Sequence, residues 1–324
     1  MASLAPLLAL PHLEDDLARV EAALLRTVQT GDPILTEVAS HLVPAGGKRL
    51  RPALALCVGE LNGRPASDDV VMGACAVELV HMGSLYHDDV MDEAKTRRNV
   101  ESVNSRWGNL VAILAGDFLL ARASEIAASL GTEVAGLLAT TIGRLCEGQV
   151  RELSQTFDVE RSEEAYLASI AGKTAALMAT ACRIGAITAG IDRADVEAFT
   201  AYGQDLGMVF QIVDDILDVV ATDEELGKPA GNDLMEGVYT LPVIRALASE
   251  NSGELRALLT GPLDRPTIDK ARALIRSNGA VGSARAVARR YASAASGTLD
   301  TLGESAVLTA LRTLPAHLEE TVPA

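Results

Sequence analysis

The chain has 324 residues, of which 48% are apolar and only 3% are aromatic. Alanine and leucine dominate, and such a mix favours packed α-helices over β-sheets. The formal net charge of −16 and an isoelectric point near 4.7 argue against nucleic acid and anionic membranes as partners, because their own negative charge would be repelled.

Amphipathic helical periodicity continues almost from end to end, and no stretch alternates apolar and polar residues as a strand would. Turns rich in Gly and Pro separate the helices, and no linker or low-complexity segment divides the chain. The sequence therefore predicts one all-α domain over residues 1–324, a bundle of about 10–13 helices. The predicted helices cover residues 12–29, 33–43, 49–62, 68–92, 107–130, 132–157, 163–189, 193–220, 239–250, 267–278, 281–300 and 304–314.

The cysteines and the N-terminus bear on location. Cys57, Cys75, Cys146 and Cys182 are widely spaced in apolar, helix-like stretches, which is typical of buried reduced thiols and not of a zinc site or a disulfide framework. Residues 1–11 are apolar but lack the basic flank of a signal peptide. No apolar run reaches the roughly 18 residues that span a bilayer. We therefore expect a soluble, cytoplasmic protein without stable membrane insertion.

Two basic segments stand out in this acidic chain. Residues 46–52 (GGKRLRP) place three cations directly after a Gly-Gly turn, and Arg97 and Arg98 form a second group. Guanidinium groups bind phosphate through paired hydrogen bonds, and lysine acts as a point charge. The pattern indicates recognition of a phosphate or diphosphate, although a solvated basic turn is the alternative for either segment alone.

An acidic motif occurs twice, as DDVMD at residues 88–92 and as DDILD at residues 214–218. The first and last Asp of each motif are one helical turn apart, so their carboxylates share a face and repel each other. Mg²⁺ prefers a few carboxylate oxygens together with substrate phosphate oxygens. Two facing motifs therefore predict several Mg²⁺ ions around one diphosphate, whereas a single motif could equally be a solvated helix face.

Two long, charged segments, residues 93–106 and 222–238, each follow an acidic helix end. Loops of this kind often act as lids or contact ligands. Between them, Gly172-Lys173-Thr174 looks like the end of a phosphate-binding P-loop. The earlier glycine of that motif is absent, since position 167 is Leu, and the surroundings are helical. Nucleotide binding of that kind is therefore not expected.

The order of these motifs along the chain resembles that of the trans-type polyprenyl diphosphate synthases, over roughly residues 35–250. The motifs are GGKRLRP, DDVMD with RR, GKT, FQIVDDILD and GKP. The resemblance implies an all-α bundle around a deep central cavity and a homodimer. It implies a magnesium-dependent prenyltransferase that joins isopentenyl diphosphate to an allylic diphosphate head to tail, with three Mg²⁺ ions when substrate is bound. It also implies that the released diphosphate takes the proton, since no general base stands out.

The resemblance assigns roles residue by residue. The expected magnesium ligands are Asp88, Asp89, Asp92, Asp214, Asp215 and Asp218. The residues that match positions binding isopentenyl diphosphate are Lys48, Arg51, His81 and Arg98. Those that match positions holding the allylic diphosphate are Arg97, Lys173, Gln211 and Lys228. Thr174 matches a residue beside the developing allylic cation.

Two features depart from the family pattern. Asn99 stands where the family usually has Gly after the double Arg, which is a mild change in a loop. Residues 314–324 lack the basic side chains that end many short-chain members. This tail therefore cannot supply an arginine that closes over the isopentenyl diphosphate.

Product length in this family depends on how deep the cavity runs below the first acidic motif. Large aromatic residues four or five positions before the motif stop growth early, but Gly83 and Ser84 stand there, with Val80 one turn further. One isoprene unit is about as long as one helical turn, roughly 5.4 Å. We expect a product of thirty carbons or more. A twenty-carbon product is the alternative if Tyr86 or Phe118 obstructs the tunnel.

Two other functions share part of this pattern. A class I terpene cyclase shares the helical fold and one acidic motif, but its second metal site has an Asn/Ser/Glu pattern and its cavity is rich in aromatics. A regulatory subunit of a heteromeric synthase would typically have lost its acidic motifs, and this chain keeps both. Both features favour the synthase.

Overall fold

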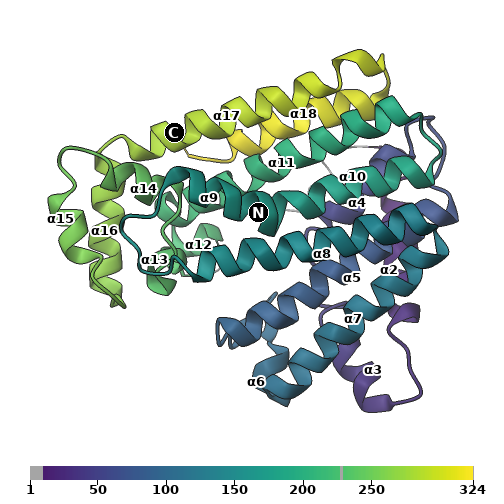
Figure 1. Cartoon of the computed structure of the whole chain (residues 1–324), viewed down its shortest axis with the longest axis horizontal. Coiled ribbons are helices and arrows are strands. Elements are labelled where there is room, and N and C mark those ends of the chain that lie inside the picture. Colours follow the sequence, from purple (N-terminus) through teal and green to yellow (C-terminus); the bar gives the residue numbers. More distant parts are fainter. Residues whose placement is uncertain (1–9, 227–228, 324) are drawn as a thin grey trace.

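The computed structural model describes residues 10–226 and 229–323 and is helical almost throughout these ranges (Figure 1). The elements are α2 (Leu13–Thr27), α3 (Pro33–Ser40), α4 (Leu50–Gly59), α5 (Asp68–Met91), β1 (Thr96–Arg97), β2 (Val100–Glu101), α6 (Val103–Trp107), α7 (Asn109–Ser129), α8 (Thr132–Leu153), α9 (Glu163–Ile170), the π-helix η1 (Ala171–Ala175), α10 (Ala176–Thr188), α11 (Arg193–Val220), α12 (Asp223–Leu226), α13 (Asn232–Glu236), α14 (Leu241–Leu247), α15 (Gly253–Leu258), α16 (Arg265–Ser277), α17 (Ala280–Thr298), the 3₁₀ turn η2 (Asp300–Leu302) and α18 (Ala306–Glu320).

Capping residues explain where the helices that lead to the site begin. The Asp32 side chain accepts hydrogen bonds from two backbone N–H groups of α3, and Pro33 occupies the first position of that helix. Ser67 caps α5 in the same way through the N–H of Val70. These contacts satisfy donors that the first turn of a helix leaves without partners. The predicted starts at residues 33 and 68 are confirmed.

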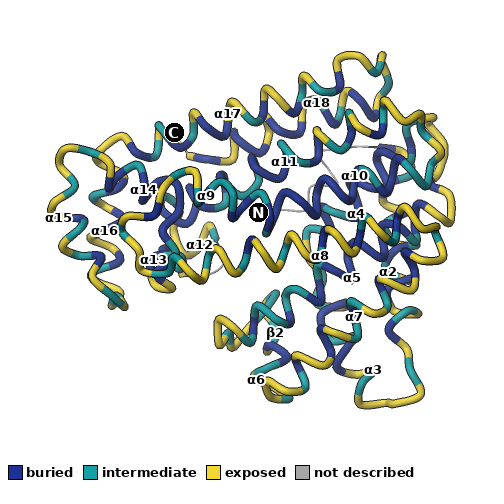
Figure 2. Tube along the Cα trace, in the orientation of Figure 1, coloured by how far each residue is buried: buried dark blue, intermediate teal, exposed yellow. Residues whose placement is uncertain are grey.

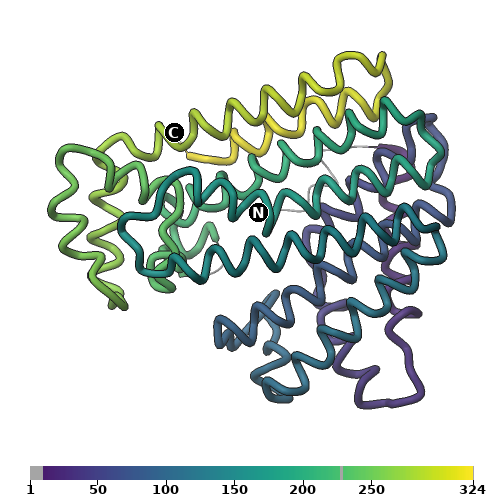
Figure 3. The backbone as a smooth tube through the Cα atoms, viewed as in Figure 1, coloured from purple at the N-terminus to yellow at the C-terminus, as the bar shows by residue number. Residues whose placement is uncertain are grey.

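The long helices α5, α8, α10 and α11 lie side by side at the centre of the molecule (Figure 1). The most extensive contacts join α5 to α7 and α11 to both α10 and α17. The trace in Figure 3 shows that α12–α16 gather at one end, while α17 and α18 return along α11. The predicted all-α bundle is confirmed, and both acidic motifs lie on central helices.

Apolar packing holds these helices together, and the buried residues follow the central helices in Figure 2. One large core cluster contains residues from the helices α2 through α11 and from α17 and α18. A smaller cluster packs α14–α16 against the end of α11. Burial of apolar area is the main favourable term for such a fold. The rigid central helices that result can hold side chains of a site in fixed positions.

The predicted elements are wrong in several short segments. Residues 96–101 form an antiparallel hairpin, with Thr96 opposite Glu101 and Arg97 opposite Val100, although no strand was expected. Strands of two residues leave no periodic signal. The second charged segment contains α12 and α13, and α15 was missed. Helix α18 continues through Pro315 to Glu320 and does not end at residue 314, because an interior proline removes one hydrogen bond without always stopping a helix.

Two expectations need correction here, namely that no apolar run is long enough to span a bilayer and that all four cysteines are buried. Among the described residues, one continuous helix, Glu163–Thr188, is long and apolar enough to cross a membrane, but 78% of its apolar window is buried inside the fold. That burial is typical of a core helix. Cys57, Cys75 and Cys182 are buried as expected, whereas Cys146 is exposed.

Candidate active site

The first acidic motif ends α5. Asp88 and Asp89 lie in the last turn, and Asp92 caps the helix through its N–H, 2.8 Å from the Asp88 carbonyl oxygen. Asp89 is fully buried, and its Oδ1 accepts a 2.7 Å hydrogen bond from Arg97 Nε and lies 2.7 Å from Arg97 Nη2 in an ion pair. Burial raises the pKa of the Asp88 and Asp89 carboxyls, and the charge of Arg97 opposes that shift at both. The carboxylates at this helix end therefore favour a nearby cation.

The β1–β2 hairpin aims the two arginines in different directions. Its two turn residues, Arg98 and Asn99, both have left-handed backbones, with φ of 52° and 62°. Tight hairpins need positive φ at both positions, and Asn adopts it more readily than most residues. This explains why Asn99 can stand where the family has Gly. Arg97 points to Asp89, while Arg98 reaches back to the carbonyl oxygen of Gly46.

The three cations of residues 46–52 divide into two kinds. Arg49 has a left-handed backbone with φ of 45° and turns inward, where it donates hydrogen bonds to Glu21 and Glu78. Lys48, Arg49 and Arg51 all contribute to the lining of the cavity described below, and Lys48 Nζ lies 5.3 Å from the centre of the Phe210 ring. Arg49 is therefore a structural cation held by two carboxylates, and Lys48 and Arg51 are the candidates for binding a ligand.

A buried glutamate organises this basic group. Glu78 is 1% exposed, accepts a 2.6 Å hydrogen bond from Arg49 Nη1, and has an oxygen 3.5 Å from Arg98 Nη2. Gly47 allows the close approach of Arg98, since a Cβ at Gly47 would lie 2.9 Å from the guanidinium carbon. Glu78 thus offsets the repulsion among neighbouring guanidinium groups.

Arg51 and His81 lie beside this basic group, and both line the cavity. Burial lowers the pKa of Arg51 to about 10, and its Nε has no hydrogen-bond partner among the described residues. Burial, together with the charges of Arg51, Arg98, Arg49 and Arg97, lowers the pKa of His81 well below its usual range. His81 is therefore neutral at physiological pH and can offer one N–H donor.

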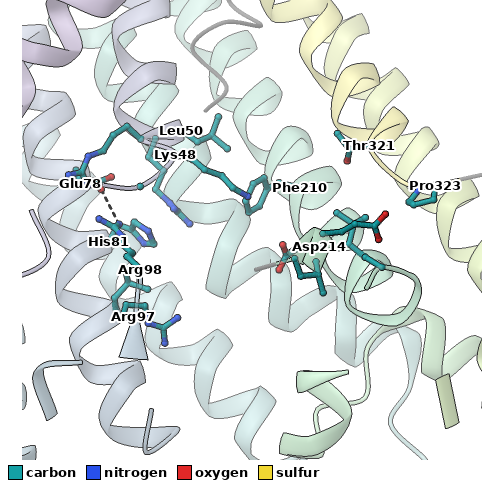
Figure 4. A pocket seen from close by; sticks show the side chains of 18 residues that line it. Lys48, Leu50, Glu78, His81, Arg97, Arg98, Phe210, Asp214, Thr321 and Pro323 are labelled. Carbon is teal, nitrogen blue, oxygen red and sulfur yellow. Dashed lines mark hydrogen bonds and ion pairs between the residues drawn. The ribbon is translucent and has the colours of Figure 1, made fainter. Parts of the chain in front are cut away.

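These residues surround a cavity of about 620 Å³ (Figure 4). Lys48, His81, Arg97 and Arg98 come from one side, whereas Phe210 and Asp214 on α11 come from the other. The C-terminal tail also reaches this cavity, where Thr321 and Pro323 form part of its lining. A cationic wall thus faces a carboxylate across a space large enough for a small anionic ligand.

The three aspartates of the second motif have different surroundings. Asp214 lines the cavity. Asp215 is 3% exposed and accepts hydrogen bonds from Tyr166 Oη at 2.6 Å and Gln211 Nε2 at 2.8 Å; burial raises its pKa to about 7. Asp218 is also buried, and its oxygens accept 3.2 Å hydrogen bonds from the first N–H groups of α13. Asp214 is therefore the member that faces the cavity.

The π-helix η1 interrupts the helix that was predicted over residues 163–189 and carries Lys173 and Thr174. Such π segments are often found at functional sites. Lys173 Nζ lies 2.7 Å from Glu152 Oε1, and Thr174 Oγ1 donates a 2.7 Å hydrogen bond to Gln211 Oε1. Burial lowers the pKa of Lys173, but the charges of Glu152, Asp88 and Asp92 more than compensate, so that its pKa is raised. Lys173 is a cation at neutral pH.

A second cavity of about 410 Å³ adjoins the first, since Arg51, His81 and Leu85 line both. It begins at Asp88, Lys173 and Thr174 and is otherwise mostly apolar. Its remaining lining is Ser84, His87, Met91, Leu145, Cys146, Gln149, Val150 and Leu153. An apolar space that starts at the acidic motif suits a hydrocarbon chain.

Of the three predicted chain-length residues, only Ser84 lines this cavity among the described residues. Gly83 faces α7, where a Cβ would lie 3.1 Å from the Gly116 carbonyl oxygen, and Val80 is fully buried in the core. Tyr86 points away and donates a hydrogen bond to the Val38 carbonyl oxygen. Phe118 is not part of the described lining either. Gly83 and Val80 therefore do not line the described cavities, because Gly83 packs against α7 and Val80, one turn below Ser84, is enclosed in the core.

Three polar residues of the site were missed at the sequence level, namely Glu78, Glu152 and Tyr166. A detectable signal existed for Glu78, because a lone carboxylate inside the apolar run at residues 70–80 must be paired if it is buried. Glu152 and Tyr166 fit ordinary amphipathic helices and gave no such signal. Lys228 lies outside the described residues.

The carboxylates fit a divalent cation that shares substrate oxygens. Among the residues that the structure describes, no three acidic, His or Cys side chains converge on one point. The Oδ2 of Asp89 is buried without a hydrogen-bond partner there. A buried carboxylate oxygen in that state favours a cation, and Mg²⁺ commonly binds through one or two carboxylates plus phosphate oxygens. The acidic motifs suit ions that arrive together with a diphosphate.

Comparisons with known proteins place the chain. A sequence model of the polyprenyl synthetase family matches residues 32–275. The nonaprenyl diphosphate synthase of Mycobacterium tuberculosis is 39% identical over 281 residues, which cover 86% of this chain and 84% of that protein. The decaprenyl diphosphate synthase of Rhodobacter capsulatus superposes with a TM-score of 0.88 at 34% identity, covering 96% of this chain and 98% of that one.

A geranylgeranyl pyrophosphate synthase of Corynebacterium glutamicum, solved with calcium and isoprenyl diphosphate, superposes with a TM-score of 0.85 at 41% identity, covering 96% of both chains. The family match, the sequence identity and the shared fold cover most of the chain. The protein therefore belongs to the polyprenyl synthetase family.

Proposed function

We propose that this protein condenses isopentenyl diphosphate with an allylic diphosphate, head to tail, and repeats the step until the product has thirty carbons or more. The observation that carries the proposal is the cationic wall of Lys48, Arg51 and Arg98, which faces Asp214 across the 620 Å³ cavity. The apolar second cavity begins beside it. Charged head groups and a growing hydrocarbon chain would thus have adjoining compartments.

We propose that Asp88, Asp89, Asp92 and Asp214 hold Mg²⁺ together with the allylic diphosphate. Asp215 and Asp218, which were expected as further ligands, accept hydrogen bonds within the protein and would support Asp214 from their buried positions. When bound, the ions supply positive charge where the leaving diphosphate develops negative charge. The calcium in the Corynebacterium glutamicum structure supports the use of a divalent ion. Three ions with substrate bound is the expectation from the family.

The chain's own residues would divide the two substrates between them. Lys48, Arg51, His81 and Arg98 would grip the isopentenyl diphosphate, with neutral His81 as a hydrogen-bond donor. Lys173, at the start of the apolar cavity, would hold the allylic diphosphate with Arg97, Gln211 and Lys228. Thr174 would place its hydroxyl beside the allylic carbon. Holding both substrates in one geometry lowers the entropic part of the barrier.

The reaction balances without a redox partner. The allylic C–O bond breaks, and its electron pair leaves with the diphosphate. The double bond of isopentenyl diphosphate then supplies the pair that forms the new C–C bond, and the loss of one proton restores a double bond. The diphosphate that has just left is the proton acceptor we propose, because no described side chain of the cavity is an evident base for this step.

We further propose that the protein acts as a homodimer in the cytoplasm. Leu110 and Leu114 of α7 are 79% and 65% exposed, which is unusual for leucines on one face of a helix and supports an interface between two copies. The fully buried Cys57 and Cys182 are consistent with a reducing compartment.

The proposal is tested by a product assay. Purified protein is incubated with Mg²⁺, labelled isopentenyl diphosphate and farnesyl diphosphate, and the dephosphorylated products are sized by chromatography. We expect chains of thirty carbons or more, as the names of the nonaprenyl and decaprenyl relatives suggest. A stop at twenty carbons would keep the chemistry but favour the activity named for the Corynebacterium glutamicum relative. No extension of any allylic primer would overturn the proposal.

A further inference from the structure

A chain of buried hydrogen bonds lies behind the second acidic motif. Tyr166 Oη donates to Asp215 Oδ2 at 2.6 Å, and Gln211 Nε2 donates to Asp215 Oδ1 at 2.8 Å. Thr174 Oγ1 then donates to Gln211 Oε1 at 2.7 Å. Both oxygens of Asp215 are thus engaged, and the chain joins three helical segments, α9, η1 and α11.

Tyr166 is the fixed end of this chain. Its side chain is among the largest that are fully buried, and the guanidinium carbon of Arg161 lies 5.6 Å from the centre of its ring. Arg161 is itself 4% exposed and donates hydrogen bonds of 3.0 Å to the Tyr239 carbonyl oxygen and to Gln155 Oε1. The tyrosine is thus held by Arg161 at its ring and by Asp215 at its hydroxyl, which keeps the hydroxyl in one place.

We propose that Tyr166 is a positioning residue for the metal–diphosphate site. It holds the Asp215 carboxylate away from the 620 Å³ cavity, so that of the second motif only Asp214 is part of the described lining of that cavity. Through Asp215 it also fixes the amide of Gln211 and hence the hydroxyl of Thr174. The inference rests on the proposed function and extends it to a residue that does not line either large cavity.

The physical reason is the charge of Asp215. A hydroxyl that donates to a carboxylate at 2.6 Å makes a charge-assisted hydrogen bond, which is roughly twice as strong as a neutral one. Without that donor, a buried carboxylate oxygen would lack a partner, and the side chain would gain by turning toward solvent or toward a cation. It would then compete with Asp214 for the ion and release Gln211.

The test compares Tyr166→Phe with Tyr202→Phe. Tyr202 is an equally buried tyrosine whose hydroxyl donates to the Leu311 carbonyl oxygen at 2.7 Å, so the control loses one buried hydrogen bond remote from the acidic motifs. Binding of a farnesyl thiodiphosphate, which cannot ionise readily, is followed by calorimetry at increasing Mg²⁺.

For Tyr166→Phe we expect the Mg²⁺ concentration for half-maximal binding to rise about tenfold, the effect of losing one hydrogen bond to a charged group. The KM for isopentenyl diphosphate should change less than twofold, since Lys48 and Arg98 are not part of the chain. Tyr202→Phe should leave both quantities unchanged. A purely structural role would lower thermal stability in both variants and leave the Mg²⁺ requirement of the folded protein unchanged.

A double-mutant cycle with Asp215→Asn decides whether Tyr166 acts through Asp215. Asp215→Asn has its own effect, but in that background Tyr166→Phe should add less than twofold, because there is no charged group left to hold. Equal effects in both backgrounds, or no effect of Tyr166→Phe on the wild-type protein, would overturn the inference. If the wild-type protein binds no analogue at any Mg²⁺ concentration, the proposed function fails instead.

Discussion

The ionisation of a buried side chain, Glu60, should contribute to how stability depends on pH. Glu60 is 1% exposed, and burial together with the charge of Asp16 raises its pKa from 4.5 to about 7. Between about pH 4.5 and pH 7, Glu60 is therefore protonated in the native state and ionised in the unfolded state. Because ionised Glu60 is disfavoured only in the native state, its cost is absent below about pH 4.5 and is complete above about pH 7.

The variant Glu60→Gln should remove this cost. Gln keeps a donor toward Asp16 and carries no charge. We expect its free energy of unfolding to match that of the wild-type protein at pH 4 and to exceed it by about 1–3 kcal/mol at pH 8. Denaturant unfolding at pH 4, 6 and 8 measures the difference. A difference that is the same at all three pH values would show that Glu60 does not titrate in this range.

Residue size at position 84 should set product length. Ser84 lines the apolar cavity one turn below Asp88, and its hydroxyl donates to the His81 carbonyl oxygen at 2.8 Å. Ser84→Phe would place a ring in the path of the growing chain, so we expect shorter products on the same chromatogram. Ser84→Ala, which loses the hydroxyl but adds no bulk, should keep the wild-type distribution. Identical products from Ser84→Phe would place the hydrocarbon chain elsewhere.

At the scale of elements, the contact between α8 and the π-helix η1 is unusually close. A Cβ at Gly148 would lie 2.5 Å from the Lys173 backbone nitrogen and 2.8 Å from the Ser169 carbonyl oxygen. The two backbones touch, and no side chain can be accommodated without moving one of them. Because η1 carries Lys173, this contact determines where the lysine stands relative to the first acidic motif.

Gly148→Ala should therefore push η1 away from α8. We expect a loss of about 1–3 kcal/mol in the free energy of unfolding and a raised KM for the allylic substrate, measured by denaturation and by kinetics. Gly143→Ala, on the same helix but with nothing within 4 Å of the added Cβ, is the matched control and should stabilise the protein by about 0.5–1 kcal/mol. If both variants behaved alike, the close contact would have no consequence.

Sequence periodicity predicted the long helices because each has to bury one face, and burial leaves a repeat of 3.6 residues. It did not predict the β1–β2 hairpin, α12, α13 or α15, which are each six residues or fewer. It also could not separate η1 from the α-helices on either side, since a π-helix has the same composition and differs only in its hydrogen bonds. The starts of helices were predicted more reliably than the end of α18. A capping residue lies next to the helix start that it marks, whereas Pro315 can either end a helix or stand inside it.

At the scale of the whole molecule, sequence motifs identified the charged residues of the site but not their contacts. Arg49 and Lys48 are neighbours in one motif and both contribute to the cavity lining, yet Arg49 donates a hydrogen bond to Glu78 whereas Lys48 Nζ lies over the Phe210 ring. Asp214 and Asp215 likewise point to different surroundings. Such differences follow from helix rotation and tertiary packing, so they could not be derived from spacing alone. Tyr166 and Glu152, from segments without a motif, become part of the site only through the fold.

The proposed assembly of two copies belongs to this scale as well, and α7 offers its test. Leu110, Ile113 and Leu114 lie three and four residues apart, so they share one face of the helix, and they are 79%, 40% and 65% exposed. Their removal from water favours association. We expect Leu110→Glu combined with Leu114→Glu to convert a dimer into a monomer in light scattering, because burying two carboxylates without partners is unfavourable. Leu25→Glu, at a leucine that is 44% exposed on α2, should leave the dimer intact. A wild-type monomer, or a dimer that survives the double substitution, would mean that this face of α7 is not the interface.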